Sequence, residues 1–315
     1  MAPIRRSGPI SATVSNWLST STTPLIPDVR SNSVSSIPRG LPQNASNIAP
    51  QIIGDPTIVG LIGPAFSGET KSTGQIFSEA GLVSTTGSAT NVTLTQQGWK
   101  TFFRGLANDG VQGPAVANYL KKTLGFQKIC VVDDSTDYGS GLANAVRGTL
   151  GNDCNVSVKK GDKDFSAAVA QLKNAAPDAV YFGGYYAEAA PLVQQLRNGG
   201  VTATFVSSDG TKDVEFVKQA GDSAKDALLS CPCGPASNSF AKDYTAKFNQ
   251  EPGTYSTEGY DLATILVKGI DAGKSTRAGL LDWVRNYQGQ GVAREYKWNE
   301  NGELTSTLIW VYKVT

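Results

Sequence analysis

A regular alternation of short apolar runs with helix-like stretches limits the folds open to this chain more than any other feature. It begins near Ile58 and continues to about residue 207. Apolar runs of this length are typical of strands buried on both faces, and a 3.6-residue period between them indicates helices. The pattern predicts an α/β fold with doubly wound parallel sheets. The predicted strands are 58–63, 128–133, 154–158, 178–182 and 203–207, and the predicted helices are 68–80, 112–124, 139–150, 165–175 and 187–199.

Both ends of the chain depart from this pattern. After Gly234 three helical segments (237–249, 254–273 and 276–288) follow without strands between them. The tail then predicts two strands around an Asn301–Gly302 turn. Residues 1–41 are rich in Ser, Thr and Pro and show no sustained period, so we expect an irregular extension there. Its arginines precede no long apolar core, and no secretory signal is visible.

Composition removes several classes of function. The 315 residues are enough for two domains, and 28 basic against 27 acidic residues give no basic surface for nucleic acid. No apolar run is long enough to cross a membrane. The absence of histidine removes the commonest general base and the usual zinc ligand, so we expect no enzyme and no metal. We also expect no cofactor.

Four cysteines form two pairs in the sequence. Cys130 and Cys154 lie on successive predicted strands, which leaves a disulfide and two buried thiols as alternatives. Cys231 and Cys233 are closer than the cysteines of most zinc sites, and no second pair accompanies them. They are interpreted as structural thiols or as a local disulfide.

Turns of small polar residues follow several predicted strands. Ser67 follows strand 58–63 and is a natural N-cap for the next helix, whose free amides attract an anion. A second hydroxyl turn, 86–91, follows the next short apolar run. Because ligands bind at the carboxyl ends of strands in such sheets, two such turns predict an anion site.

An acidic pair follows strand 128–133. Asp133 and Asp134 raise the alternative of a magnesium-dependent phosphotransfer site, but their spacing does not match the arrangement that this chemistry needs. Tyr138 then opens the next helix, where its ring would lie at the edge of a binding site.

The motifs GPAFSGET, GSATN, DDSTDYGSGLA, GDKDFSAAVAQLK, PDAVYFGGYYAEAAPLVQQLR and SSDG occur in this order. From Asn44 to Thr315 the chain resembles the branched-chain amino acid binding proteins of bacterial ABC importers, which have the type I periplasmic binding fold. The resemblance implies two lobes, 42–111 with 235–300 and 112–234 with 301–315. The chain would cross between them near 109–112, 231–234 and 298–303.

The resemblance also implies how an amino acid would be held between the lobes. Ser67 and Thr90 would bind its carboxylate, and the Ser88 carbonyl with Thr90 would meet its ammonium. Asp209 would neutralise the ammonium, although some relatives have a glutamate there. The implied ligand-binding residues are Ser67, Ser88, Ala89, Thr90, Tyr138, Tyr185 and Asp209, with the two tyrosines walling the ligand's side chain.

One departure from the family concerns its opening strand–helix–strand unit, which nothing in residues 1–41 resembles. Strand 58–63 would then have an unpaired edge, and the first lobe would bind weakly and aggregate.

The leading interpretation is a monomeric solute-binding protein, periplasmic or at the cell surface, that delivers its ligand to a membrane permease. The alternative is an amino-acid or amide sensor of the same fold. An aspartate-dependent hydrolase or phosphotransferase is disfavoured by the missing histidine and by the spacing of the aspartates. The choice among leucine, isoleucine, valine, phenylalanine and amide-like ligands is left undecided.

Overall fold

The computed structural model describes residues 2–5, 30–31, 41–151, 153–305 and 308–315, and the chain divides into two compact units. Unit 1 comprises Met1–Ala107 and Pro235–Ser306, and unit 2 comprises Asn108–Gly234 and Thr307–Thr315. The last boundary lies six residues beyond the expected 300, because Gly302 and Leu304 still pair within unit 1. The Arg104 amide donates to the Gly302 carbonyl at 2.9 Å, and Leu304 forms a β-bridge with Trp298.

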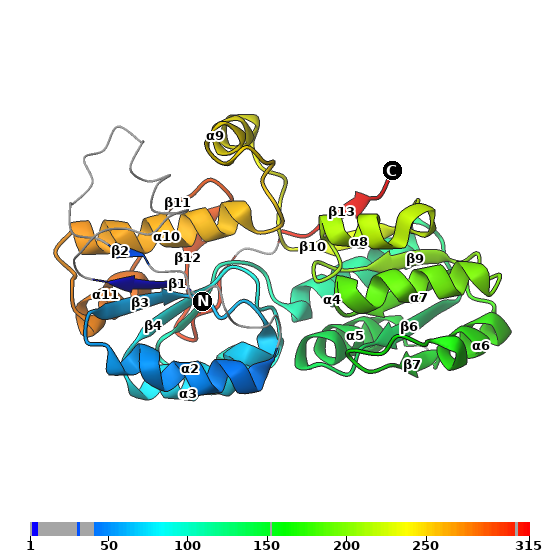
Figure 1. Ribbon diagram of the computed structural model, residues 1–315, viewed down its shortest axis with the longest axis horizontal. Coiled ribbons are helices and arrows are strands. Elements are labelled where there is room, and N and C mark those ends of the chain that lie inside the picture. The colour runs from blue at the N-terminus through cyan, green and yellow to red at the C-terminus, as the bar shows by residue number, and fades with distance from the viewer. Residues whose placement is uncertain (1, 6–29, 32–40, 152, 306–307) are drawn as a thin grey trace. The chain divides into compact units, whose positions relative to one another are not determined.

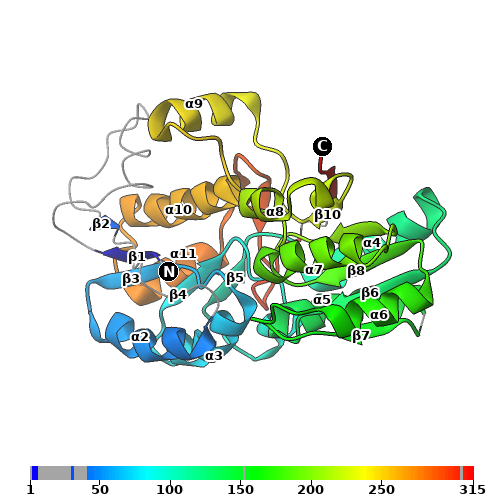
Figure 2. The same ribbon diagram turned by 45° about the vertical axis from the view of Figure 1, so that its right-hand side comes forward.

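Unit 1 contains a sheet of order β2-β1-β3-β4-β5. Helices α2 and α3 lie along one face of this sheet, and α10 covers the other (Figure 1; Figure 2). The first two residues of β3 contact opposite layers: Ile58 packs with α2 and α3, and Val59 packs with α10 and α11. The strands are β1 (Ala2–Arg5), β2 (Arg30–Ser31), β3 (Ile58–Ile62), β4 (Val83–Thr86) and β5 (Phe102–Arg104); the helices are α2 (Pro42–Gly54), α3 (Ser67–Glu79), α9 (Asn238–Phe248), α10 (Ser256–Asp271) and α11 (Arg277–Arg285), with the 3-10 turn η1 (Val92–Gln96).

The expected unpaired edge of β3 is a wrong prediction. Strand β1 pairs with β3 along that edge in the antiparallel sense, with Ala2 opposite Ile62 and Ile4 opposite Gly60, and β2 pairs with β1. The free amides and carbonyls of an edge strand accept any extended segment, whatever its side chains. Strand β1 has only four residues, one of them Pro3, so it is too short to show an alternation of apolar and polar residues. The sequence pattern therefore did not predict this strand.

Unit 2 contains a sheet of order β13-β10-β9-β8-β6-β7, parallel except for β13. Both faces are buried: Cys130 and Val132 pack with α6 and α7, whereas Ile129 and Val131 pack with α4 and α5. This explains the continuous apolar runs in the sequence. The elements are α4 (Asp109–Asn118), η2 (Tyr119–Thr123), β6 (Ile129–Asp133), α5 (Asp137–Leu150), β7 (Asn155–Ser157), α6 (Ser166–Ala175), β8 (Ala179–Gly183), α7 (Tyr186–Asn198), β9 (Thr204–Ser207), α8 (Val214–Ala220), η3 (Gly221–Ala224), β10 (Leu228–Cys231) and β13 (Trp310–Lys313).

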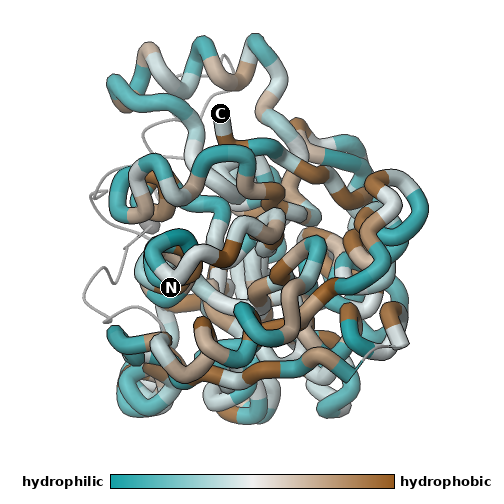
Figure 3. Tube along the Cα trace, turned by 90° about the vertical axis from the view of Figure 1, so that its right-hand side faces the viewer, coloured by the Kyte–Doolittle hydropathy of each residue, from teal (hydrophilic) through white to brown (hydrophobic). Residues whose placement is uncertain are grey.

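The C-terminal segment has the predicted turn and a final strand, but the two strands do not pair with each other as a hairpin would. Strand β12 (Glu295–Lys297) pairs with β11 (Gln288–Gln290), and the Trp298–Leu304 bridge closes the Asn301–Gly302 turn. The last strand, β13, instead pairs with β10 in unit 2. Figure 3 shows hydrophobic and hydrophilic stretches alternating along the helices, as amphipathic helices require. None of the helices in the described ranges is long and apolar enough to span a bilayer.

All four cysteines are in disulfides. Cys130 in β6 is bonded to Cys154 at the start of β7, with their Cα atoms 4.7 Å apart. These strands are neighbours, so the strand order that the sequence predicted for them is confirmed. Cys231 is bonded to Cys233, which corresponds to the local disulfide among the alternatives.

Candidate functional site

In unit 1 the carboxyl ends of β3 and β4 bring the two predicted hydroxyl turns together. Thr90 is fully buried, and its hydroxyl oxygen Oγ1 has no hydrogen-bond partner in the part of the chain that the structure describes. Ser67 lies beside it, because the Ser67 Oγ accepts a hydrogen bond from the Asn91 amide at 3.2 Å. A buried hydroxyl without a partner is costly unless a ligand completes it.

The expectation that Ser67 caps helix α3 is wrong. Phe66 occupies the N-cap position with extended backbone, and Ser67 is already the first helical residue. The Ser67 side chain therefore binds the neighbouring turn instead of its own helix. The backbone amides of the first turn of α3 lie at the positive end of the helix dipole, which favours an anion.

Hydroxyl groups connect the two turns to each other. Ser88 Oγ donates to the Ala65 carbonyl at 2.7 Å, and Thr86 Oγ1 donates to the Pro64 carbonyl at 2.9 Å. The Ala89 amide donates to Thr86 Oγ1 at 3.1 Å, and the Ala89 side chain is fully buried. The backbone around Thr90 is therefore held in one arrangement.

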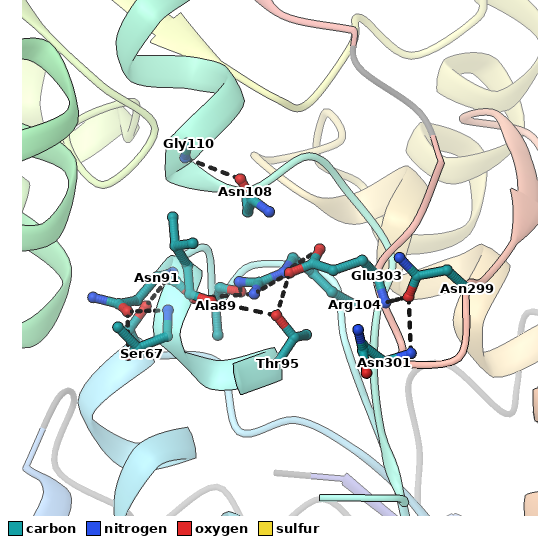
Figure 4. A network of polar contacts seen from close by, with 12 residues as sticks. Ser67, Ala89, Asn91, Thr95, Arg104, Asn108, Gly110, Asn299, Asn301 and Glu303 are labelled. Carbon is teal, nitrogen blue, oxygen red and sulfur yellow. Dashed lines mark hydrogen bonds and ion pairs between the residues drawn. The ribbon is translucent and has the colours of Figure 1, made fainter. Parts of the chain in front are cut away.

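A fully buried arginine, Arg104, lies at the end of β5 and holds the same turn (Figure 4). Its guanidinium donates to the carbonyls of Ala89 (2.6 Å) and Asn91 (3.0 Å) and forms an ion pair with Glu303. Nothing in the local sequence distinguishes this arginine from a surface residue, and the sequence prediction missed it.

In unit 2 Asp209 follows β9 and is buried. Its Oδ1 atom accepts two hydrogen bonds, from Gln112 Nε2 at 2.8 Å and from the Tyr138 hydroxyl at 2.9 Å. Gln112 is fully buried and also lies 3.1 Å from Ser230 Oγ. Two donors on one oxygen fix the plane of the carboxylate. Gln112 was not predicted, because a glutamine on a helix has no sequence signature.

The two predicted tyrosines lie together. Their ring centroids are 5.0 Å apart, and Tyr185 is only half-buried. Tyr138 is nearly fully buried, and its hydroxyl also contacts Ser208 Oγ at 2.8 Å and accepts from the Gly210 amide at 3.0 Å. Tyr138 therefore presents a ring to Tyr185 and a hydroxyl to Asp209.

The two carboxyl groups of the acidic pair after β6 are each held by hydrogen bonds within unit 2. Burial would raise the pKa of Asp133, but hydrogen bonds from Arg147 and Ser157 outweigh it and hold the pKa below its usual range. Burial raises the pKa of Asp134 to about 6, with Glu188 adding a like charge and Thr136 opposing the shift. Among the described residues, no three acidic or cysteine side chains come together as a metal site.

The free energy of unfolding of the Asp134→Asn variant should depend less on pH than that of wild type. The pKa of Asp134 is about 6 in the folded chain and about 3.9 when unfolded, so the folded state binds more protons between these values. Stability therefore falls as pH rises through this window, by about 3 kcal/mol for this one group. Urea unfolding of both proteins from pH 4 to pH 7 measures the difference. Parallel stability curves would contradict the assignment.

Comparisons with known proteins agree with this architecture. A family model described as periplasmic binding protein matches residues 39–315. An amino acid binding protein of Pseudomonas aeruginosa and a leucine-specific-binding protein of Salmonella typhimurium are each 30% identical over 284 residues, 86% of this chain and 76% of each relative. The crystal structure of a leucine binding protein from Thermotoga maritima superposes with a TM-score of 0.80 at 26% identity, covering 88% of this chain and 82% of the other. The chain belongs to the periplasmic binding protein family.

Proposed function

We propose that this protein binds a branched-chain or similar aliphatic L-amino acid and delivers it to the membrane permease of an ABC importer. The observation that carries the proposal is the buried Thr90 hydroxyl, which has no hydrogen-bond partner among the described residues and lies on the turn bonded to Ser67 at the amino end of α3, a site suited to a carboxylate. Asp209, held by two donors, supplies the opposite charge. Relatives named for leucine, and for leucine, isoleucine, valine, threonine and alanine, support the ligand class.

Each part of the ligand would meet matching chemistry. The carboxylate would accept hydrogen bonds from Thr90, from the first turn of α3 and from Ser67, and the ammonium would bind Asp209 and the Ser88 carbonyl. The aliphatic side chain would pack on the rings of Tyr138 and Tyr185. Burial of three or four methylene groups contributes about 2–3 kcal/mol, while the charged hydrogen bonds orient the ligand.

This role requires binding and release without chemical change. Residues of both units would contact the ligand, and hinge closure is a common mode for proteins with two units joined by several strands. The protein would act as a monomer in the periplasm or at the cell surface. The two disulfides fit an oxidising compartment.

Isothermal titration calorimetry with leucine, isoleucine, valine and phenylalanine tests the ligand class, and leucinol serves as the control without a carboxylate. We expect saturable binding of at least one aliphatic amino acid and much weaker binding of leucinol. At about 100 times the dissociation constant, a ligand should stabilise the protein by about 2.7 kcal/mol in thermal unfolding. Failure of all four amino acids to bind would refute the proposal.

The Thr90→Val variant should separate ligand binding from folding. Valine has nearly the same shape, and the hydroxyl that it lacks has no partner among the described residues, so the free energy of unfolding should not fall. Binding of the amino acid should weaken by about 1–3 kcal/mol, because a hydrogen bond to a charged carboxylate is lost. Calorimetry and urea unfolding of the same preparation measure both quantities. Full affinity in the variant would exclude Thr90 from the carboxylate site.

A further inference from the structure

We propose that Arg104 is a positioning residue for carboxylate recognition: it aims the Thr90 amide and hydroxyl at the ligand without contacting the ligand itself. The inference rests on the proposed function. The guanidinium is completely buried at the end of β5 and contacts the turn that contains Thr90.

The guanidinium holds the carbonyls on both sides of Thr90. Nη1 donates to the Ala89 carbonyl at 2.6 Å, and Nη2 donates to the Asn91 carbonyl at 3.0 Å. In a planar trans peptide the C=O and N–H bonds point in opposite directions. Because the Ala89 carbonyl points at Arg104, the Thr90 amide of the same peptide points away from it. The next peptide is held too, since the Asn91 amide donates to Ser67 Oγ.

Glu303 holds the other side of the guanidinium in a fork. Its Oε1 lies 2.9 Å from Nη2 and its Oε2 lies 3.2 Å from Nε, and Thr95 donates to Oε1 at 2.6 Å (Figure 4). A planar guanidinium that engages a carboxylate and two carbonyls has one orientation, which a lysine ammonium cannot reproduce. The ion pair with Glu303 also neutralises the buried charge of Arg104. A carboxylate would therefore be attracted by the polarised peptide groups of the turn and not by a net positive charge.

The hairpin that carries Glu303 is itself fixed to Arg104. Besides the bond from the Arg104 amide to Gly302, the Trp298 indole donates to the Arg104 carbonyl at 2.6 Å. Asn299 Oδ1 closes the turn by accepting from the amides of Asn301 and Glu303. Gly302 has a φ of +77°, and a Cβ there would collide with the Phe102 carbonyl. A rigid turn therefore fixes the position of Glu303. The ion pair with Glu303 in turn fixes the orientation of the Arg104 guanidinium.

The Arg104→Lys variant tests the inference through the ratio of leucine to leucinol affinity, measured by calorimetry. We expect leucine to bind about 10- to 100-fold more weakly, with leucinol affinity unchanged, because only the carboxylate contacts are misaligned. In isotope-labelled wild type, leucine should change the chemical shift of the Thr90 amide. In Arg104→Lys this change should be lost. If Arg104→Lys does not fold, Glu303→Gln is the second test variant. It keeps the size of the side chain and should change both readouts in the same direction.

Arg277→Lys is the matched control. Arg277 donates to the carbonyls of Ile58, Ile53 and Asp55 at the opposite end of β3, so its loss should lower stability and leave the affinity ratio unchanged. If Arg104→Lys lowers the affinity for leucine and leucinol equally, or changes only stability, the positioning role is wrong. If wild type binds neither compound, the proposed function fails and this inference fails with it.

Discussion

The Asp209→Asn variant is expected to bind leucine about 30- to 900-fold more weakly than wild type, a loss of about 2–4 kcal/mol. An asparagine oxygen in the place of Oδ1 can still accept from Gln112 and Tyr138, so the surroundings of residue 209 should persist. The asparagine NH₂ group would then take the place of the second carboxylate oxygen. It would present a donor, without charge, to the ligand's ammonium.

Calorimetry at fixed ionic strength measures this loss, with Asp213→Asn as the control. Asp213 is the N-cap of α8, and its side chain accepts from the Glu215 amide at 2.9 Å. Asparagine caps a helix as well as aspartate does, so the control removes the same charge without disturbing the fold. Wild-type affinity in Asp209→Asn, or an equal loss in the control, would contradict the role of Asp209.

The Arg294→Met variant should destabilise unit 1 by about 3–5 kcal/mol, the cost of leaving a buried charge without its partner. Arg294 and Glu258 form an ion pair in which both side chains are essentially inaccessible to water. Burial already raises the pKa values of Glu258 and Asp261, and Arg294 opposes both shifts. Without Arg294, two neighbouring carboxyl groups must be protonated or stay charged in an apolar interior.

Urea unfolding followed by tryptophan fluorescence measures this effect, because Trp99, Trp283 and Trp298 lie in unit 1. Circular dichroism recorded in parallel shows whether the two units unfold together or in separate transitions. Arg285→Met is the control, since Arg285 is an exposed arginine of the same unit that donates to the Lys100 carbonyl. An unchanged unfolding midpoint for Arg294→Met would show that the pair is not buried as described.

Most of the strands and helices between Ile58 and Ser207 were predictable, because their signals are local. A strand buried on both faces must be apolar throughout, as in β6 and β8, and a helix that covers a sheet must be amphipathic. The hydroxyl turns at Ser67 and Thr90 were also visible, since each follows an apolar run within a few residues. For the same reason the neighbouring strands of Cys130 and Cys154 could be anticipated.

The features that the sequence did not reveal depend on contacts between distant segments. Strand β1 is defined by its hydrogen bonds to β3, so it needs no side-chain pattern. Strand β13 was expected, but its pairing with β10 was not, because a strand's pattern does not name its neighbour. Gln112 is 97 residues from Asp209, and Arg104 is 199 residues from Glu303. The sequence alone determined which residue types follow each strand, because solvent exclusion and turn geometry act over a few residues. Only the tertiary structure decided which donor meets which acceptor, because a buried polar group takes whichever partner the packed chain brings within about 3 Å.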